Sequence, residues 1–437
     1  MTLHFSAPLG LGGRMTPPPD KSITHRALML AAVSKGECTV ANPLAIGDCL
    51  STRGCLAALG VNIAEEAGGA GKPARWRIAG RGLRDLAEPA GVLDAQNSGT
   101  TMRLLCGLLA GLPLYAVLTG DGSLRSRPML RVVEPLRAMG ARIEGRAGGR
   151  LPPLSLLPGG GSLAPLRYEL PVASAQVKSA LLLAALRAEG ESSLGGQLGS
   201  RDHTERLFSF LGVPLRRERD RLICSPPASI PAFELRVPGD PSSAAFFLAA
   251  ALISGRELEV DGCGLNPTRL GFVEVLRRMG ASIQLEPQES QGGEPVGRLH
   301  LRPAALQGTE VSAAEIPSLV DEVPLLAVLG AFARGRTVVR GAQELKHKES
   351  DRLQAAARLL AAVGGRMEPF ADGFAVEGPQ QLSFGRVDPG GDHRIAMAAA
   401  VLASGIPAGV EVRGFEAAMV SFPDFLGAFR ALGGKIE

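Results

Sequence analysis

The chain has 437 residues, of which 45% are hydrophobic and 21% are charged, and its formal net charge is +4. This usage is typical of a folded globular protein and excludes intrinsic disorder. With 1 Trp and 2 Tyr, the chain is poorly equipped to stack single-stranded nucleic acid, and its dispersed basic residues favour an acidic small-molecule ligand. We therefore expect no nucleic-acid partner.

Targeting and membrane signals are missing from the sequence pattern. The first six residues contain no basic segment followed by an apolar core, so we expect no secretory signal. The apolar runs Leu181–Leu186 and Ala244–Ile253 are shorter than the about 20 residues that a bilayer span needs, and we expect them to be buried helices. The six cysteines form no C-x-x-C pair or Cys/His cluster. These features predict a cytoplasmic protein that binds neither a membrane nor a metal.

Six similar segments follow one another along the chain, at intervals of roughly 70–85 residues, which is longer than the usual solenoid repeat of about 20–50. Each segment closes with a hydrophobic residue, a glycine, two further residues and Ile, Leu or Met. These closing tags end at Ile63, Ile143, Leu215, Ile283, Met367 and Ile436. Length alone suggests about three domains. The repeats instead predict two domains, each built from three βαβ-like units.

Within each segment, an apolar helical stretch begins directly after a small polar or charged cluster. The six clusters are Pro19–Ser22, Gln96–Thr100, Ser174–Gln176, Pro238–Ser242, Asp321–Pro324 and Gly391–Arg394. Asp, Asn and Ser are N-cap residues, and Pro241 and Pro324 suit a first helical turn. If the units pack with the same polarity, several helix N-termini converge on a cleft that suits anionic small molecules. The alternative is six ordinary helix caps without a ligand.

The first two segments contain the clearest anion-binding pattern. Lys21, Ser22 and Arg26 place an ammonium, a hydroxyl and a guanidinium at one helix start, which suits phosphate or carboxylate, although a solvated helix start is the alternative. In the second segment, Gly99 lets a ligand approach the backbone closely. The later string Arg125–Pro128 is weak evidence by itself, and its proline suits a helix start.

Segments three and four are less informative. The string Ser200–Glu205 begins a helix and has two interpretations: His203 and Asp202 could form a catalytic pair, or the string could be a structural helix cap. Asn266–Arg269, in the fourth segment, is expected to be mainly structural.

The fifth segment carries the most reactive pattern. Asp321 heads the apolar helix that we expect over Val323–Phe332, and a second helix is expected to include Lys348, Glu349 and Arg352 on one face. Asp321 and Glu349 supply two carboxylates, which is the minimum for removing one proton and delivering another. A charged, solvated helix is the alternative. The sixth segment adds a helix start at Asp392–Arg394.

Six strings in this order and spacing, over essentially the whole chain, resemble the 3-phosphoshikimate 1-carboxyvinyltransferase family. They are PDKSITHR, NSGTTMRLL, SAQVKSALLLAA, RDHTE, KHKESDRL and DHRIAMAAA. The resemblance is to the family's second class, described for glyphosate-tolerant bacterial enzymes, and glyphosate is a possible inhibitor. It implies an α/β fold of two similar domains, each of three βαβαββ units, in an inside-out α/β barrel. One domain would comprise 1–19 and 239–437 and the other 20–238, with hinges near 17–21 and 237–241.

The resemblance also implies which residues bind the two substrates. Those for shikimate 3-phosphate are Lys21, Ser22, Arg26, Ser174, Ala175, Gln176, Arg201, Asp321 and Lys348. Those for phosphoenolpyruvate are Lys21, Gly99, Arg127, Gln176, Glu349, Arg352 and Arg394. We expect Asp321, Glu349, Lys21 and His393 to serve catalysis. Many family members have a lysine where this chain has Val420, so the cation expected near phosphoenolpyruvate must come from elsewhere or be dispensed with.

The expected activity is transfer of the enolpyruvyl group of phosphoenolpyruvate to the 5-hydroxyl of shikimate 3-phosphate, by a monomer without cofactor or metal. One alternative is the related enzyme that acts on a UDP-linked N-acetylglucosamine. That enzyme characteristically carries a cysteine in a loop that corresponds to Gly120–Pro128 here, which contains none. The second alternative is a non-catalytic anion-binding relative.

Overall fold

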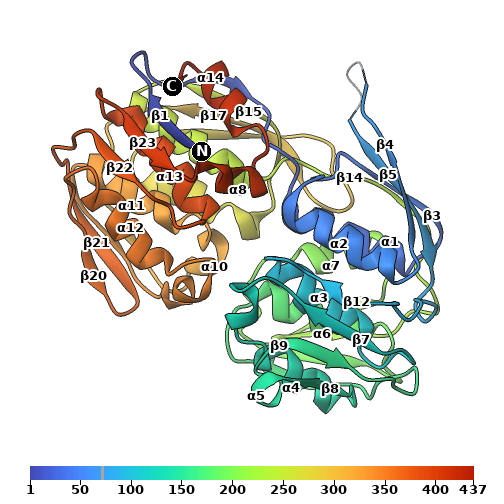
Figure 1. The fold of residues 1–437 in the computed structure, drawn as a ribbon. Helices are drawn as coiled ribbons and strands as arrows, with labels where there is room; N and C mark the ends of the chain where they lie inside the picture. The colour runs from blue at the N-terminus through green and yellow to red at the C-terminus, as the bar shows by residue number, and fades with distance from the viewer. Residues whose placement is uncertain (70–72) are drawn as a thin grey trace. The chain divides into compact units, whose positions relative to one another are not determined.

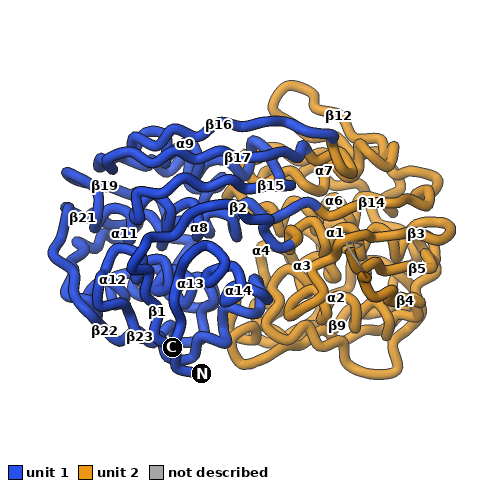
Figure 2. Tube along the Cα trace, turned by 90° about the horizontal axis from the view of Figure 1, so that it is seen from above, with its two compact units in different colours: residues 1–18, 238–289, 295–437 blue, residues 19–237, 290–294 orange. Residues whose placement is uncertain are grey.

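The computed structural model describes residues 1–69 and 73–437 (Figure 1). The chain divides into two compact units (Figure 2). Unit 1 comprises Met1–Pro18, Pro238–Glu289 and Pro295–Glu437, and unit 2 comprises Pro19–Val237 and Ser290–Glu294. The short segment Ser290–Glu294 therefore belongs to unit 2 although the chain on both sides of it belongs to unit 1, which no sequence pattern indicated.

Each unit contains three four-stranded sheets within the described residues, and all six sheets have the same strand order. A parallel pair forms one edge, and two antiparallel neighbours complete the sheet. In unit 2 the sheets are β14 (Glu234–Arg236), β3 (Lys35–Ala41), β5 (Arg75–Arg81) and β4 (Asn62–Glu66); β6 (Leu93–Asp94), β7 (Ala116–Thr119), β9 (Leu151–Leu156) and β8 (Ile143–Gly145); and β10 (Arg167–Leu170), β11 (Ser192–Gly196), β13 (Arg221–Cys224) and β12 (Leu215–Glu218).

In unit 1 the same order recurs, which confirms the six repeated units that the closing tags predict. The sheets are β2 (Gly13–Met15), β15 (Leu258–Gly264), β17 (Val296–Arg302) and β16 (Ser282–Pro287); β18 (Glu310–Val311), β19 (Gly335–Val339), β21 (Gly373–Gly378) and β20 (Glu368–Phe370); and β22 (Gly385–Val387), β23 (Val410–Arg413), β1 (Thr2–Ser6) and β24 (Lys435–Ile436).

Three of these strands reach their sheet from a distant part of the chain. β2 leads along the chain into the first helix of unit 2 but pairs with β15 of unit 1. Conversely, β14 precedes the first helix of unit 1 but pairs with β3 of unit 2. β1 completes the last sheet beside β24, so that the two ends of the chain meet in unit 1 (Figure 1).

The first helix of every repeat is buried on nearly all sides. These helices are α1 (Lys21–Ala32), α3 (Gly99–Leu109) and α6 (Ala175–Ala185) in unit 2, and α8 (Pro241–Ser254), α11 (Val323–Phe332) and α13 (His393–Leu402) in unit 1. A helix that is apolar all round needs a buried position. The three helices of unit 1 accordingly pack against one another inside its hydrophobic core, and α3 packs against α1 and α6 in the core of unit 2.

The second helices of the repeats are amphipathic or shorter. They are α2 (Gly47–Ala58), α4 (Leu130–Ala138), α7 (His203–Phe210), α9 (Gly271–Arg278), α12 (Arg352–Ala361) and α14 (Phe425–Ala431), with the one-turn segments α5 (Arg146–Gly149) and α10 (Ile316–Leu319). Short 3₁₀ turns complete the chain at η1 (Leu124–Ser126), η2 (Pro267–Arg269), η3 (Gln343–His347), η4 (Ala403–Gly405) and η5 (Phe415–Val420). No helix among the described residues is long and apolar enough to cross a membrane.

The expected helix caps are present at five of the six first helices. The side chains of Asp20, Ser98, Ser174, Asp240 and Asp392 each accept a bond from a backbone N–H of the first turn. At α11 the cap position is Glu322, whose side chain makes no such bond. The six tag glycines all have positive φ, between 69° and 106°. Each follows the end of a second helix, where a left-handed residue closes the last turn.

Two expected helix starts were wrong. Pro128 lies before α4, which begins at Leu130, and a short 3₁₀ turn precedes it. Lys348 and Glu349 lie in the loop between η3 and α12, because the side chain of Asp351 caps α12 and starts that helix at Arg352. Glu349 nevertheless contacts Arg352, through the loop rather than along a helix face.

Candidate active site

In unit 2, the predicted anion-binding residues lie at the starts of α1, α3 and α6. The ammonium of Lys21 lies 3.2 Å from the carboxylate of Asp48 on α2. Ser22 is half-buried and Arg26 is buried. Asp48 was not selected from the sequence. The one feature that could have pointed to it is its place as an acidic residue in the first turn of α2.

The guanidinium of Arg26 connects three helices of unit 2. Its Nε donates to Thr204 Oγ1 on α7 at 2.8 Å, and its Nη2 donates to Ser179 Oγ on α6 at 2.7 Å. Its Nη1 donates to the carbonyl of Ser22 at 2.9 Å. Burial lowers the pKa of Arg26 to about 10, so the side chain stays positive at neutral pH. These bonds use three of the five N–H groups of a guanidinium, which leaves two for a ligand.

A second group forms where α3 and α6 begin. Gln176 Nε2 donates to Thr100 Oγ1 at 3.0 Å, and Gln176 Oε1 accepts from Arg103 Nη1 at 2.7 Å. A Cβ atom on Gly99 would lie 2.6 Å from Arg103 Nη1 and 3.4 Å from Arg127 Nη1. Glycine is therefore required at this position if the guanidinium of Arg103 is to stay where it is, whereas the distance to Arg127 is an ordinary contact. Arg103 is a candidate site residue that the sequence reasoning missed, although it stands four residues after Gly99.

Arg127 is also buried, and Asn97 and Ser123 hold its guanidinium. Its Nη2 donates to Asn97 Oδ1 at 2.7 Å and to Ser123 Oγ at 3.1 Å. Arg201 lies in the loop before α7, where its charge acts to lower the pKa of Arg26. Ser174 and Ala175, the cap and first residue of α6, lie next to Gln176 in the same unit. Unit 2 therefore contains five basic side chains in or beside the predicted site. Lys21, Arg26 and Arg103 lie on α1 and α3, whereas Arg127 and Arg201 lie in the loops before α4 and α7.

The interpretation of His203 and Asp202 as a catalytic pair finds no support in their contacts. Asp202 Oδ1 accepts from Arg206 Nε at 2.9 Å. His203 Nδ1 lies 2.7 Å from Glu294 Oε1, and both of these side chains are 1% exposed. Glu294 belongs to the short segment of unit 2 that is inserted between strands of unit 1. The string Ser200–Glu205 thus has mainly structural contacts, but the expected cap is also missing, because the side chain of Asp202 makes no cap bond.

In unit 1, three carboxylates surround the guanidinium of Arg352. Its Nη1 donates to Asp321 Oδ1 at 3.2 Å, and its Nη2 donates to Glu349 Oε2 at 2.6 Å. Its Nε donates to Asp392 Oδ2 at 3.0 Å. Burial acts to lower the pKa of Arg352, but Glu349, Asp392 and Asp321 together raise it above its ordinary value. Asp321 and Glu349, 28 residues apart in the sequence, are thus held by one cation.

The remaining predicted residues of unit 1 lie around this cluster. Lys348 Nζ lies 3.5 Å from Asp321 Oδ1. Asp392 caps α13 through the N–H of Arg394, and His393 follows it as the first residue of the helix. Burial acts to raise the pKa of Asp392, but the charges of Arg352 and His393 hold it below its usual range.

Arg394 is buried beside Glu322, a carboxylate that sequence reasoning did not select. The two side chains are 3.9 Å apart, and Arg394 also lies 5.7 Å from the centre of the Phe246 ring. In the fourth segment, Arg269 Nη2 donates to Asp240, the cap of α8, at 2.7 Å. This contact fits the structural role expected there and repeats the contact of Arg352 with Asp392, the cap of α13.

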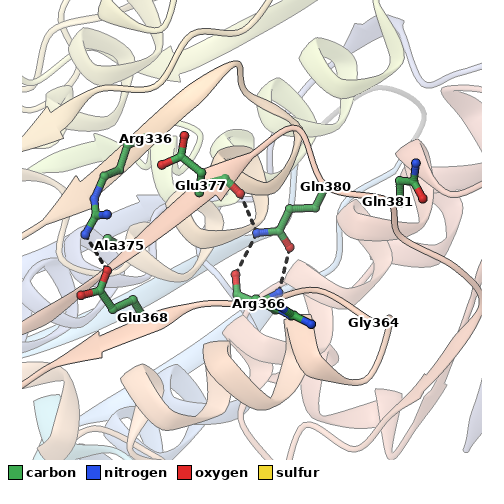
Figure 3. Close-up of a pocket in the computed structure, with 8 residues that line it drawn as sticks. All are labelled: Arg336, Gly364, Arg366, Glu368, Ala375, Glu377, Gln380 and Gln381. Carbon is green, nitrogen blue, oxygen red and sulfur yellow. Dashed lines mark hydrogen bonds and ion pairs between the residues drawn. The ribbon is translucent and has the colours of Figure 1, made fainter.

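One pocket lies away from these residues. It has a volume of about 390 Å³ and is formed by β19, β20 and β21, by the chain just before β20 and by the chain after β21 (Figure 3). Arg336 pairs with Glu368 at 2.5 Å, and Gln380 bonds the backbone of Arg366. No predicted site residue lines this pocket. Among the described residues, no group of three or more His, Cys, Asp and Glu side chains could hold a metal ion.

Comparison with known proteins places these residues in a family. Residues 6–429 match the family model described as EPSP synthase (3-phosphoshikimate 1-carboxyvinyltransferase). The chain is 51% identical to the 3-phosphoshikimate 1-carboxyvinyltransferase of Thermus thermophilus over 96% of each protein. It is 46% identical to that of Desulforudis audaxviator over 99% of each.

Solved structures agree with these sequence relationships. An EPSP synthase structure from Acinetobacter baumannii has a TM-score of 0.86 and 36% identity, with 100% of each chain covered. The enolpyruvyl transferase NikO from Streptomyces tendae shares the fold, with a TM-score of 0.75 and 17% identity over 100% of this chain and 98% of the other. With the sequence match over nearly the whole length, these findings show that the chain belongs to the EPSP synthase family.

Proposed function

We propose that this protein is a 3-phosphoshikimate 1-carboxyvinyltransferase. The 5-hydroxyl oxygen of shikimate 3-phosphate attacks the central carbon of phosphoenolpyruvate and loses its proton, while the methylene carbon gains a proton. The resulting tetrahedral adduct then loses phosphate and one methyl proton, which restores the enol ether. These steps require anion binding, one proton acceptor and one proton donor.

The observation that carries this proposal is the cluster around Arg352. The guanidinium holds Asp321 and Glu349 in hydrogen-bonding range, so one cation fixes the positions of two carboxylates. Groups that are fixed in advance lower the cost of reaching the transition state. The basic residues at the helix starts of unit 2 supply the anion-binding groups that two phosphorylated substrates need.

For shikimate 3-phosphate, we assign residues from both units. In unit 2 they are Lys21, Ser22, Arg26, Ser174, Ala175, Gln176 and Arg201, and in unit 1 they are Asp321 and Lys348. The two remaining N–H groups of Arg26 support its assignment, since a buried guanidinium gains most from a charged acceptor. Lys348 lies near Asp321, which supports a shared role.

For phosphoenolpyruvate, we assign Lys21, Gly99, Arg127, Gln176, Glu349, Arg352 and Arg394. The absence of a side chain on Gly99 leaves the space between Arg103 and Arg127 open, so we add Arg103 as a neighbour of this site. Several arginines around one small trianion match its phosphate and carboxylate, because each offers parallel N–H donors.

For proton transfer, we assign Asp321 to the 5-hydroxyl and Glu349 to the methylene carbon. Lys21 assists these steps. His393 lies next to Asp392, and Asp392 is the third carboxylate that bonds Arg352, beside Asp321 and Glu349. Because the methylene gains a proton in the addition and the methyl group loses one in the elimination, the same carboxylate can serve both steps.

A phosphate-release assay with shikimate 3-phosphate and phosphoenolpyruvate tests the proposal. We expect phosphate release that depends on both substrates, and a second arm replaces shikimate 3-phosphate with UDP-N-acetylglucosamine. Release only in the second arm would identify the enolpyruvyl transferase of the UDP-sugar branch. Release in neither arm, together with calorimetric binding of shikimate 3-phosphate, would identify a non-catalytic relative. A third arm adds glyphosate, which we propose as an inhibitor.

A further inference from the structure

Lys178 is a buried cation that none of the assignments above uses. It lies on α6, two residues after Gln176, and its side chain is 1% exposed. Its ammonium donates to the carbonyl of Leu198 at 3.2 Å and to the carbonyl of Ser200 at 3.1 Å. It also lies 2.6 Å from Glu205 Oε1 on α7. An ammonium has three N–H donors, so these three acceptors use its full bonding capacity.

The two carbonyls belong to the loop that carries Arg201. This loop runs from the end of β11 at Gly196 to the start of α7 at His203, and Ser200 directly precedes Arg201 in the chain. Loops hold their shape less firmly than helices unless their backbone groups are bonded. Lys178 bonds this loop at two carbonyls and, through Glu205, bonds the helix that follows it.

Lys178 therefore joins two sets of residues that we assign to shikimate 3-phosphate. One set, Ser174 to Gln176, lies at the start of the helix that carries Lys178. The other is Arg201, held through the backbone of its loop. A parallel connection runs through the adjacent residue, because Ser179 and Thr204 bond each other at 2.7 Å and both bond Arg26.

We infer that Lys178 is a positioning residue for shikimate 3-phosphate, which fixes the Arg201 loop against the start of α6. Glu205 completes this role by neutralising the buried ammonium. The inference rests on the proposed function for the identity of the ligand. The loop contact itself does not depend on that identity, so the two can be tested separately.

The chain offers a matched control in Arg187, a second buried cation at the other end of α6. Its side chain is also 1% exposed, and its Nη2 donates to the carbonyls of Gly107 at 3.2 Å and Ala110 at 2.9 Å. Arg187 thus bonds two backbone carbonyls as Lys178 does, but these carbonyls lie at the end of α3, away from the residues assigned to substrates. A general loss of packing would affect both variants alike.

The main experiment compares Lys178→Met with Arg187→Met by steady-state kinetics and by hydrogen exchange. For Lys178→Met we expect KM for shikimate 3-phosphate to rise about tenfold or more, the size typical for losing a charge-assisted contact. KM for phosphoenolpyruvate and kcat should change by less than about threefold. Amides 197–202 should exchange faster in Lys178→Met but not in Arg187→Met. Arg187→Met should leave KM for shikimate 3-phosphate unchanged.

A double variant protects the test against a failure to fold. Lys178→Met alone leaves Glu205, whose side chain is 13% exposed, without its lysine partner. Losing one partner of a largely buried ion pair is strongly destabilising, whereas replacing the whole pair by apolar residues is often tolerated. Lys178→Met/Glu205→Leu should therefore fold and still show the raised KM for shikimate 3-phosphate. The inference would be overturned if KM for shikimate 3-phosphate were unchanged in both variants. It would also be overturned if kcat fell and both KM values rose by similar factors.

The outcomes separate this inference from the proposed function. If the wild-type protein releases no phosphate and binds no shikimate 3-phosphate, the proposed function fails, and exchange at amides 197–202 alone decides whether Lys178 holds the loop. If the wild type is active and these amides exchange at equal rates in Lys178→Met and wild type, the positioning role fails while the function stands.

Discussion

Arg26 in unit 2 and Arg352 in unit 1 are both buried arginines at predicted site positions, but their partners differ in charge. Arg26 bonds two hydroxyls and a backbone carbonyl. Arg352 bonds three carboxylates. A guanidinium among neutral acceptors keeps its positive charge available to an anion, whereas one among carboxylates fixes them in place. We infer that unit 2 mainly binds anionic groups and that unit 1 supplies the groups that move protons.

The largest effect that this comparison predicts is a loss of turnover when a carboxylate of unit 1 is changed. Asp321→Asn keeps the shape of the side chain but removes its capacity to accept a proton. Because a positioned acid or base contributes about 10²–10⁴-fold, kcat in the phosphate-release assay should fall by that order, and shikimate 3-phosphate binding should also weaken. Asp372→Asn, at a carboxylate beside Arg340 in the same unit, is the control. Wild-type kcat in Asp321→Asn would remove Asp321 from proton transfer.

The two arginines should differ in their effect on stability. Arg352→Met leaves three carboxylates without their common cation, and breaking such a buried ion pair costs about 3–5 kcal/mol. Arg26→Met removes bonds to Ser179 and Thr204, which remain bonded to each other, so we expect a loss of about 1–2 kcal/mol. Denaturant unfolding measures both. Equal losses of unfolding free energy in the two variants would show that the charged partners of Arg352 do not make it more important for stability than Arg26.

A third prediction concerns binding in unit 2. Lys21→Ala should lower the affinity for each substrate by roughly tenfold to 150-fold, because a charge-assisted contact contributes about 1.5–3 kcal/mol. Its turnover should fall as well, since we assign Lys21 an assisting role. Isothermal titration calorimetry with shikimate 3-phosphate and with phosphoenolpyruvate measures the first effect. Lys346→Ala, at an exposed lysine of unit 1, is the control, and wild-type affinities in Lys21→Ala would contradict the assignment.

The last of these predictions concerns a pH dependence in unit 2. Burial lowers the pKa of His25 from 6.5 to about 3, and its Nδ1 lies 2.7 Å from Thr52 Oγ1. Below pH 6.5 the unfolded chain binds a proton that the folded one does not, so stability is lost as the pH falls. Between pH 7 and pH 5 this should cost about 2 kcal/mol.

Urea unfolding of wild type and His25→Gln at the two pH values checks this prediction. The variant keeps a polar group near Thr52 but cannot titrate, so its stability should fall by about 2 kcal/mol less than that of the wild type over the same range. The same pH dependence in both proteins would show that His25 already titrates normally in the folded chain.

Local sequence predicted the features that depend on neighbouring residues. Asp20, Ser98 and Asp392 cap helices because their side chains reach the first turn that follows them. The tag glycines close helices because glycine adopts positive φ without strain. The loop around Glu349 shows where local patterns compete. Periodicity placed it on a helix, but the side chain of Asp351 is a stronger start signal and caps α12, which begins at Arg352, three residues after Glu349.

Features that depend on distant residues could not be predicted in this way. His203 and Glu294 are 91 positions apart, and β14 pairs with β3 across most of unit 2. The two carbonyl acceptors of Lys178 lie 20 and 22 residues from it, so its sequence position indicated only that it belonged to the string SAQVK. Arg103 was overlooked because its importance depends on Gly99 and Gln176 together, and Gln176 lies on another helix.

Deuterium exchange into the methylene group of phosphoenolpyruvate tests most directly whether unit 1 carries the proton transfer. Wild type and Glu349→Gln are incubated in D₂O with both substrates at saturation, and shikimate 3-phosphate affinity is measured in parallel by calorimetry. We predict that Glu349→Gln exchanges deuterium about 10²–10⁴-fold more slowly, while its affinity for shikimate 3-phosphate stays within about threefold of wild type, since Arg26 and its partners are unchanged. Exchange at the wild-type rate in Glu349→Gln would contradict this account, and the proton would have to come from Lys21 or another group.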